Sequence, residues 1–517
     1  MKVRALVGSF VAFAMSGALV LACGDDDDDS NTNITPDSGT QTPDSGTNPG
    51  TDSGDNTPDG STGDADAETP AAPPLTPVAT TRIANAINPY GLVFASDGNL
   101  YASGATNDGG TQKLAVWRFK DGTLDTTFGT DGVVTTDLPG NETSFDIVEV
   151  SANNFVVHAV ASSKIWLVKL TNTGGTWAFG TPKFVKFGYD EGEGWPAGTT
   201  LPDAGTPPPP SYNSWGIALD KSNTASPKIV VFAAGAPAKA QNAANQRIDN
   251  DRWITRVDAN TLDFDTTFNG GAPYTVDADG KGLADNARRG MVLSDGSILS
   301  SGYTNFGQGL GNHVVLIRLL ANGTPDPAFG FGTTNPTPGQ TKFNPFVAAP
   351  NGAAEAYGVV RQSSGRYVTT GYGNSHFDVA TKAPDLVTFG VKADGLDTSY
   401  GKQGSLGLQS EADKSAGLGA TPFEDRGRDI AVLSDDRIVH AGAYDGYAAL
   451  FVLDKDGNLD PSSGLNGVIE YQYPANFFKI AVSADGKQIA ATAASLNQTG
   501  DAGVPVGSVL AVLKVGQ

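Results

Sequence analysis

The feature that most constrains this chain is an internal repeat that occurs seven times between about residue 90 and the C-terminus. In the first copy, a strand-like segment opens at Tyr90, an Asp-Gly turn follows, and a second strand-like segment runs from Leu100 to Gly104. The same opening recurs at Phe145, Trp215, Arg289, Tyr357, Arg428 and Phe478. The next residue is Gly or Asp, except in the last copy, where it is Lys479. Short strands separated by turns rich in Gly, Asp and Asn predict antiparallel meanders.

Each copy continues with further strands. The third strand reads LAVWRF in the first copy and VLAVLKV in the last, and most copies follow it with a turn such as KDGTLDTTFG and a short strand such as GVVTT. Several second strands end in small residues, as in SSG, TTG and HAG. Seven four-stranded units predict an all-β protein that folds as a seven-bladed β-propeller. An open β-solenoid is the alternative architecture.

The last copy lacks a fourth strand, because the sequence ends directly after its third. A spare strand-like segment, TTRIANAI, lies at about 80–87, just before the first copy. We expect this N-terminal segment to pair in the last blade and to close the ring, since closure removes two exposed sheet edges.

At these residues the chain resembles the delta-60 repeat family of bacterial β-propeller-type proteins. The resemblance rests on the pattern DG-x-[ILV]-x-x-[AS]-G, followed by RF-x-DG-x-LD-TTFG-x-GVV. It is strongest over 96–136, clear over 293–332 and 433–468, and degraded in the second and last copies. The family's defining residues lie in turns and strands, so the resemblance implies a fold and supplies no catalytic set.

The N-terminus has the layout of a secretory signal peptide. Lys2 and Arg4 precede an apolar segment that ends at residue 22. The segment ends in VLAC, which resembles the lipobox of bacterial lipoproteins and implies that Cys23 is lipidated. We therefore expect an exported bacterial lipoprotein, held by lipid on Cys23 at the outer membrane or the cell surface; an uncleaved anchor helix is the alternative. Because Cys23 is the only Cys, a disulfide framework and a cysteine-ligated metal site are excluded.

The negative charge is concentrated between the signal peptide and the repeats. The chain has 34 Lys+Arg and 56 Asp+Glu, a net charge of −22, and residues 24–80 carry thirteen of the acidic residues and no basic one. This stretch has no aromatic residue and repeats TPDSGT, so it cannot bury enough apolar surface to fold. We expect a signal peptide at 1–22, a disordered acidic tether at 23–79 and the propeller at 80–517. Nucleic acid is not an expected partner, because there is no net positive field.

The connections divide by length between two faces of the predicted propeller. Those between the first and second strands, and between the third and fourth, are tight, whereas those between the second and third strands and between blades hold long insertions. Function is common on loops held by a rigid scaffold, so the long-loop face is the candidate binding face. Its candidate residues are Tyr189, Asp190, Glu191, Glu193 and Trp195 in one loop, and Asn374, His376 and Asp378 in another. The first group could stack a sugar or hold a cation; solvated loops are the alternative for both.

Other chemistry is sparse. His158 and His440 fall in second strands one position apart in the aligned copies, which predicts opposite sides of the sheet and a structural role. Two acidic groups lack EF-hand spacing and are interpreted as turn residues: Asp454, Asp456, Asn458 and Asp460, and Asp277 with Asp279. No catalytic residue, metal ligand or cofactor is predicted, and calcium is the one ion left open.

These features predict a monomeric, membrane-anchored lipoprotein whose propeller is a binding or scaffold module for a protein or glycan. The alternative is an exported hydrolase or lyase with its site on the long-loop face. A deep central pocket with two or more facing carboxylates plus His or Arg would favour the enzyme, whereas a flat or plugged long-loop face would favour the binding module.

Overall fold

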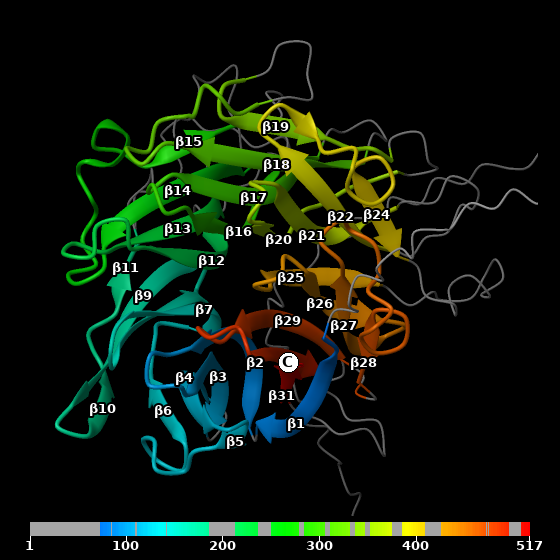
Figure 1. Cartoon of the computed structure of the whole chain (residues 1–517). Coiled ribbons are helices and arrows are strands. Elements are labelled where there is room, and N and C mark those ends of the chain that lie inside the picture. Colours follow the sequence, from blue (N-terminus) through cyan, green and yellow to red (C-terminus); the bar gives the residue numbers. More distant parts are fainter. Residues whose placement is uncertain are drawn as a thin grey trace, which may run out of the picture. The chain divides into compact units, whose positions relative to one another are not determined.

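Seven antiparallel β-sheets surround a central axis, which confirms the predicted all-β, seven-bladed propeller (Figure 1). This architecture comes from a computed structural model, in which the described residues belong to one compact unit, Thr69–Gln517. The described residues are 73–83, 85–108, 111–140, 142–185, 212–235, 250–278, 284–305, 311–330, 337–346, 352–374, 385–408, 425–471, 473, 475–495 and 508–516. Within these ranges, no helix has the length and apolar character needed to cross a membrane.

The strands of the first three blades follow the chain from the axis outward. The first blade contains β2 (Ala86–Phe94), β3 (Leu100–Asp108), β4 (Thr111–Lys120), β5 (Thr123–Leu124) and β6 (Val133–Thr136). The second contains β7 (Glu142–Ser151), β8 (Asn154–Ala161), β9 (Lys164–Thr173), β10 (Thr176–Phe179) and β11 (Lys183–Phe184). The third contains β12 (Tyr212–Asp220), β13 (Lys228–Gly235), β14 (Asp251–Asp258) and β15 (Tyr274–Val276), with a short 3-10 turn, η1 (Phe268–Gly270), before β15.

The remaining four blades repeat the same order. The fourth contains β16 (Asp285–Val292), β17 (Ile298–Asn305), β18 (Asn312–Leu319) and β19 (Gln340–Phe343). The fifth contains β20 (Gly358–Arg361), β21 (Tyr367–Gly373), β22 (Asp385–Lys392), β23 (Gly395–Leu396) and β24 (Ser405–Leu408). The sixth contains β25 (Arg426–Val432), β26 (Ile438–Tyr444), β27 (Tyr447–Leu453) and β28 (Val468–Glu470). The seventh contains β29 (Ala475–Val482), β30 (Gln488–Ser495), β31 (Ser508–Val515) and β1 (Leu75–Ile83).

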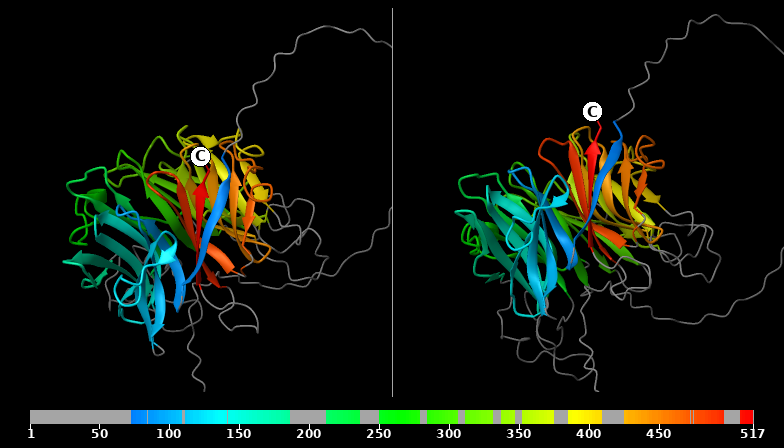
Figure 2. Two further views of the ribbon diagram at one scale, coloured as in Figure 1. Left: turned by 60° about the horizontal axis from the view of Figure 1, so that its bottom comes forward. Right: turned by 90° about the horizontal axis from the view of Figure 1, so that it is seen from below.

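The ring closes through an N-terminal strand, as predicted. β1 pairs antiparallel with β31, from Leu75 opposite Val515 to Ile83 opposite Ser508, and the two strands lie side by side in Figure 2. The bounds differ from the predicted 80–87, because β1 begins at Leu75 and the chain turns at Asn85, whose φ is 57°. The segment 75–79, which we had expected in the tether, is therefore paired in the last blade.

The repeated third-to-fourth turn is a local hydrogen-bonded structure. Asp125 accepts hydrogen bonds from the Thr127 N–H (3.0 Å) and hydroxyl (2.6 Å) and pairs with Arg118 (2.7 Å). The Arg118 guanidinium also lies over the Phe128 ring, 5.1 Å from its centroid. Equivalent arginine–aspartate pairs are Arg256–Asp265, Arg318–Asp326, Arg366–Asp397 and Arg437–Asp460. The recurrence of this sequence pattern is thus explained by the hydrogen bonds and the ion pair that the turn needs.

The core lies between neighbouring blades. One cluster joins the third and fourth blades through Val230, Phe232, Ile254, Phe268, Ile298, Val315, Ile317 and Leu319. Blades pack closely enough that small residues are needed where second strands pass the inner strands. A Cβ atom at Gly442 would overlap the carbonyl oxygen of Arg426, so the HAG ending is a packing requirement.

Candidate functional site

Six of the seven innermost strands have an irregular residue near the central axis. The innermost strands are β2, β7, β12, β16, β20, β25 and β29, and they surround the axis in Figure 1. In six of them the pairing register shifts next to the residue that opens the repeat, for example between Ser144 and Asp146 around Phe145. A β-bulge re-aims the side chain at that point. The seven opening residues are therefore candidates to fill the channel.

Aromatic side chains from five blades do meet across this channel. The Tyr90 ring lies 4.2 Å from Phe478, 5.5 Å from Phe145 and 6.1 Å from Trp215, centroid to centroid. Phe145 lies 4.8 Å from Trp215, and Trp215 lies 6.0 Å from Tyr357. Tyr90 and Trp215 come from blades that are not neighbours, so their contact spans the axis. Each such ring pair adds about 0.5–1.5 kcal/mol beyond its buried area.

Two arginines complete the aromatic layer. The Arg288 guanidinium lies 4.4 Å from the Tyr357 centroid and 5.1 Å from Trp215, and it donates to the Tyr357 hydroxyl (3.0 Å). Arg428 lies 5.0 Å from Tyr357 and 5.2 Å from Phe478. Burial by itself lowers the pKa of Arg288, but nearby tyrosines and Glu355 outweigh it and raise the pKa. Arg288 therefore stays charged and is held by the ring faces.

A buried ionic layer crosses the same channel. Arg289 reaches Asp146 (3.5 Å) and Asp429 (3.6 Å), and Lys479 reaches the same two carboxylates (3.1 and 3.6 Å). Arg289 also donates to the carbonyl oxygens of Phe145 (3.3 Å) and Phe478 (3.0 Å). All four charged side chains are at most 15% exposed. Two cations thus balance two anions on the axis.

These aspartates also satisfy the inner strand edges. The Ile217 N–H of the third blade donates to Asp146 (3.3 Å), and the Ile480 N–H of the last blade donates to Asp429 (3.2 Å). Buried backbone groups at an unpaired edge are costly without partners. Gly216 occupies the equivalent position in the third blade, where a Cβ atom would lie 3.3 Å from the Asp146 carboxylate. The Gly, Asp and Lys residues that follow the opening residues therefore belong to the packing that fills the channel.

A cavity of about 580 Å³ opens on the tight-turn face instead. It is lined by Val93, Phe94, Val148, Glu149, Leu219, Lys221, Ser222, Val292, Leu293 and Ser294. These residues lie at the ends of the inner strands of the first four blades or in the turns that follow. The Glu149 carboxylate joins two blades, because the Ser96 N–H and hydroxyl both donate to it at 2.7 Å. Sequence reasoning missed this cavity, since tight turns carry no signal of a hollow between them.

Most predicted residues of the long-loop face lie outside the described residues. This applies to Tyr189, Asp190, Glu191, Glu193, Trp195, His376 and Asp378, and also to Cys23. Asn374 is described: it directly follows β21 and is partly buried at the start of a second-to-third connection.

The two histidines of the second strands are buried in the sheet. In the strand register, His158 of β8 lies opposite Asp146 of β7. His440 of β26 lies opposite Ile430 of β25, which is one position further along the aligned strand, as predicted. Neither imidazole forms a hydrogen bond within the described part of the chain. Burial lowers the pKa of each to about 3, and the charges of Arg289 and Lys479 add to the effect at His158. Both rings are neutral at pH 7.

The calcium-like run in the sixth blade is a turn, as interpreted. The Asp454 carboxylate accepts the N–H groups of Asp456 and Asn458, each at 2.9 Å. Asp460 accepts the Ser462 N–H (3.0 Å) and pairs with Arg437 (3.1 Å). These carboxylates are used within the turn.

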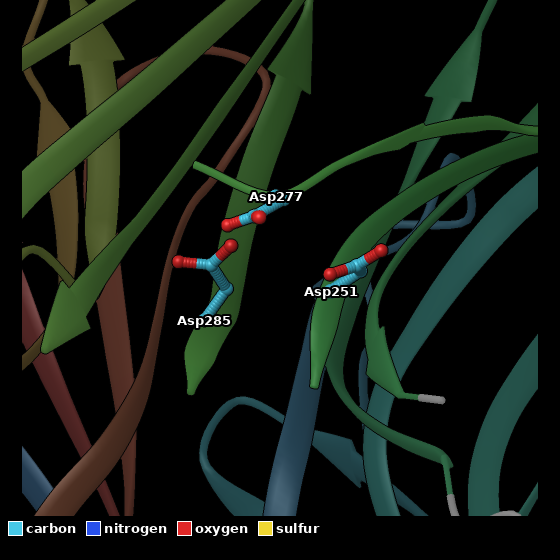
Figure 3. Close-up of side chains that lie close together, drawn as sticks. All are labelled: Asp251, Asp277 and Asp285. Atoms are coloured by element: carbon cyan, nitrogen blue, oxygen red, sulfur yellow. The ribbon is translucent and has the colours of Figure 1, made fainter. Parts of the chain in front are cut away.

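A different acidic cluster was not predicted from the sequence (Figure 3). Asp251 begins β14, Asp285 begins β16, and Asp277 directly follows β15. One carboxylate oxygen from each lies within 4.8 Å of the other two. Asp251 and Asp285 are buried at 5% and 0% exposure, and Asp277 is partly buried. Asp277, which we interpreted as a turn residue, is thus part of a cluster, whereas Asp279 lies outside the described residues. Three oxygen ligands of this kind could hold a hard cation.

Comparison with known proteins supports the fold. The model of a β-propeller domain of unknown function, DUF5122, matches residues 95–128 and 293–329, which belong to the first and fourth repeats. With the seven blades, this match makes the chain a propeller-repeat protein. No curated protein matches the chain.

Several solved structures are similar at low identity. The Dos1 propeller is 12% identical over 86% of this chain and 95% of its own, with a TM-score of 0.41. A luciferin-regenerating enzyme is 8% identical over 85% and 97%, with a TM-score of 0.35. An endo-arabinase from Bacteroides thetaiotaomicron is 11% identical over 60% and 97%, with a TM-score of 0.30. These likenesses are too distant to bear on function.

Proposed function

We propose that this protein is an exported, membrane-anchored lipoprotein whose propeller binds a protein or glycan partner through its long-loop face. The observation that carries the proposal is the plugged channel. Five aromatic rings and a balanced ionic layer fill the axis, where a propeller enzyme would need a deep pocket. Because the channel is filled, a partner would have to bind at a face of the propeller.

The axial carboxylates are poor candidates for catalysis. Asp146 is engaged by Arg289, by Lys479 and by a backbone N–H of the next blade. Asp429 has the same set of partners. A general acid or base needs access to substrate and a proton that it can exchange. Both groups are instead committed to holding the ring together, which favours the binding module over the hydrolase or lyase alternative.

Binding is tested with the full-length protein and purified envelope components, namely polysaccharides, peptidoglycan fragments and outer-membrane proteins. Saturable retention of one component without chemical change in it is the expected result. Turnover of a polymer without saturable retention would contradict the proposal and favour the enzyme.

Anchoring is tested separately at Cys23. Mass spectrometry of the mature protein is expected to find an N-terminal lipidated Cys23, and the Cys23→Ser variant is expected to leave the membrane fraction. A membrane-bound Cys23→Ser protein that retains residues 1–22 would support the uncleaved anchor instead.

A further inference from the structure

We propose that Asp251, Asp277 and Asp285 form a binding site for one hard divalent cation, Ca²⁺ in preference to Mg²⁺ or Zn²⁺. The site lies on the long-loop face, where the third and fourth blades meet (Figure 3).

The spacing of the three carboxylates fits a single calcium ion. Their oxygen atoms all lie within 4.8 Å of one another. Oxygen ligands at 2.3–2.6 Å from one Ca²⁺ are at most about 5 Å apart, whereas ligands at 2.0–2.1 Å from Mg²⁺ are at most about 4.2 Å apart. The oxygen atoms are therefore close enough to share one Ca²⁺, and three carboxylates suit Ca²⁺ better than Mg²⁺, which is usually bound through one or two carboxylates and keeps several waters. Three carboxylates and no thiolate or imidazole among the ligands also disfavour Zn²⁺.

Hydrogen bonds hold the three segments together before any ion binds. The Asp285 N–H donates to the carbonyl oxygen of Asn250 (2.9 Å), next to Asp251. The Ala278 N–H, next to Asp277, donates to Asp285 Oδ2 (2.5 Å). Because two of the ligands begin β-strands, they sit on rigid elements. This preorganisation distinguishes the cluster from a run of aspartates in one loop.

A buried hydroxyl lies beside the cluster. Thr304 is 0% exposed, and its Oγ1 atom has no hydrogen-bond partner among the described residues. Thr304 lies directly opposite Asp285 in the pairing of β16 with β17. The adjacent pair is joined by the Asn305 N–H and the Ala284 carbonyl (3.2 Å), so Asp285 and Thr304 form a non-hydrogen-bonded pair. In such pairs the side chains share one face, with Cβ atoms about 4.5–5.5 Å apart. The hydroxyl is thus available to the ion or to a water on it.

Arg252, Lys342 and His313 lie near the cluster. Arg252 directs its guanidinium to neutral acceptors, the Val315 carbonyl (2.9 Å), the Ser300 hydroxyl (2.5 Å) and the Ser301 carbonyl (3.0 Å). Lys342 donates to the Ala278 carbonyl. His313, opposite Thr304 on β18, has a pKa lowered by burial.

The site is tested on the full-length protein after EDTA treatment and dialysis. Calorimetric titration with CaCl₂ is expected to show one saturable site, with weaker binding of MgCl₂. The Asp277→Asn variant is expected to weaken this site by roughly tenfold or more, because ligand charge sets the affinity. Saturating Ca²⁺ should also raise the unfolding temperature of wild type more than that of Asp277→Asn.

Two controls keep the test decisive. Asp277 is only partly buried, so its variant is the one expected to fold if Asp251→Asn or Asp285→Asn does not. Asp295→Asn changes an aspartate that only caps a turn through the Ser297 N–H (2.9 Å), and it should bind Ca²⁺ like wild type. The acidic segment 24–80 is common to all variants. Equal Ca²⁺ binding by wild type and folded Asp277→Asn would assign the ion to that segment or to the general surface and overturn the proposal, as would the absence of Ca²⁺ binding.

Discussion

Arg289→Met is expected to destabilise the propeller strongly, although the change lies far from the blade cores. The substitution leaves Asp146 and Asp429, at 5% and 8% side-chain exposure, with Lys479 as their one remaining axial cation. It also removes the donor to two inner-edge carbonyl groups. Removing one member of a buried ion-pair network costs about 3–5 kcal/mol. For roughly 440 residues from β1 to β31, at about 2.1 cal/mol/K per residue, 4 kcal/mol lowers the unfolding temperature by about 4 °C.

The assay is thermal and urea unfolding of wild type, Arg289→Met, Asp146→Asn and the double variant. The double variant removes one charge of each sign and leaves Asp429 with Lys479. Its loss should be smaller than the sum of the single losses by about 1–3 kcal/mol. Arg361→Met is the matched control, since Arg361 ends an inner strand and is exposed, and it should stay within about 0.5 kcal/mol of wild type. Additive losses, or single losses below about 1 kcal/mol, would refute the axial network as a structural element.

Three further predictions concern the histidines, the closing strand and the repeat turn. Because burial holds the pKa of His158 and His440 at about 3, the unfolded chain binds protons near pH 6.5 that the folded chain does not. The stability from these two groups is therefore full well above pH 6.5 and falls as the pH decreases, by about 3 kcal/mol for both between pH 6.5 and 5, and urea unfolding of a variant with both changed to Leu should lose this slope. Deleting 24–83 should yield aggregates or oligomers in size-exclusion chromatography, because the deletion exposes the edge of β31. Deleting 24–72, which keeps β1, should leave a monomer. Monomers from both deletions would argue against closure of the ring by β1. Asp125→Ala should lower the free energy of unfolding by about 1–3 kcal/mol, since Arg118 and the turn lose their acceptor. An unchanged unfolding curve would show that the turn does not stabilise the blade.

The blades could be predicted from the sequence because their signals are local. Asp125 and Thr127 form a turn through hydrogen bonds between neighbouring residues, so the same sequence pattern forms the same turn where it recurs. An Asp-Gly pair likewise turns the chain without contacts from distant residues. Residues 75–79 of the closing strand were not predicted, because their local sequence is typical of a tether. Pro77 is typical of a tether, but β1 is an outer strand, where a missing N–H is tolerated, and the pairing is irregular immediately after it.

The plug and the acidic cluster could not be predicted in the same way. The aligned positions already display aromatic or Arg residues followed by Gly, Asp or Lys. However, Arg289 contacts Asp146 and Asp429 from blades that are not its neighbours, so the contacts exist only once the ring is closed. Asp251 and Asp285 belong to different blades and share no sequence motif. Their proximity depends on how the third and fourth blades pack, which spacing along the chain does not encode.

The most direct test compares the two faces of the propeller in binding. The partner retained by the full-length protein is titrated against wild type, a long-loop variant, Trp195→Ala, and a tight-turn variant, Lys221→Ala, which lines the cavity on the opposite face. We expect Trp195→Ala to weaken binding by roughly tenfold or more, as buried aromatic anchors commonly do, and Lys221→Ala to bind like wild type. Binding lost in Lys221→Ala and kept in Trp195→Ala would contradict the account, because it would move the function to the cavity on the tight-turn face.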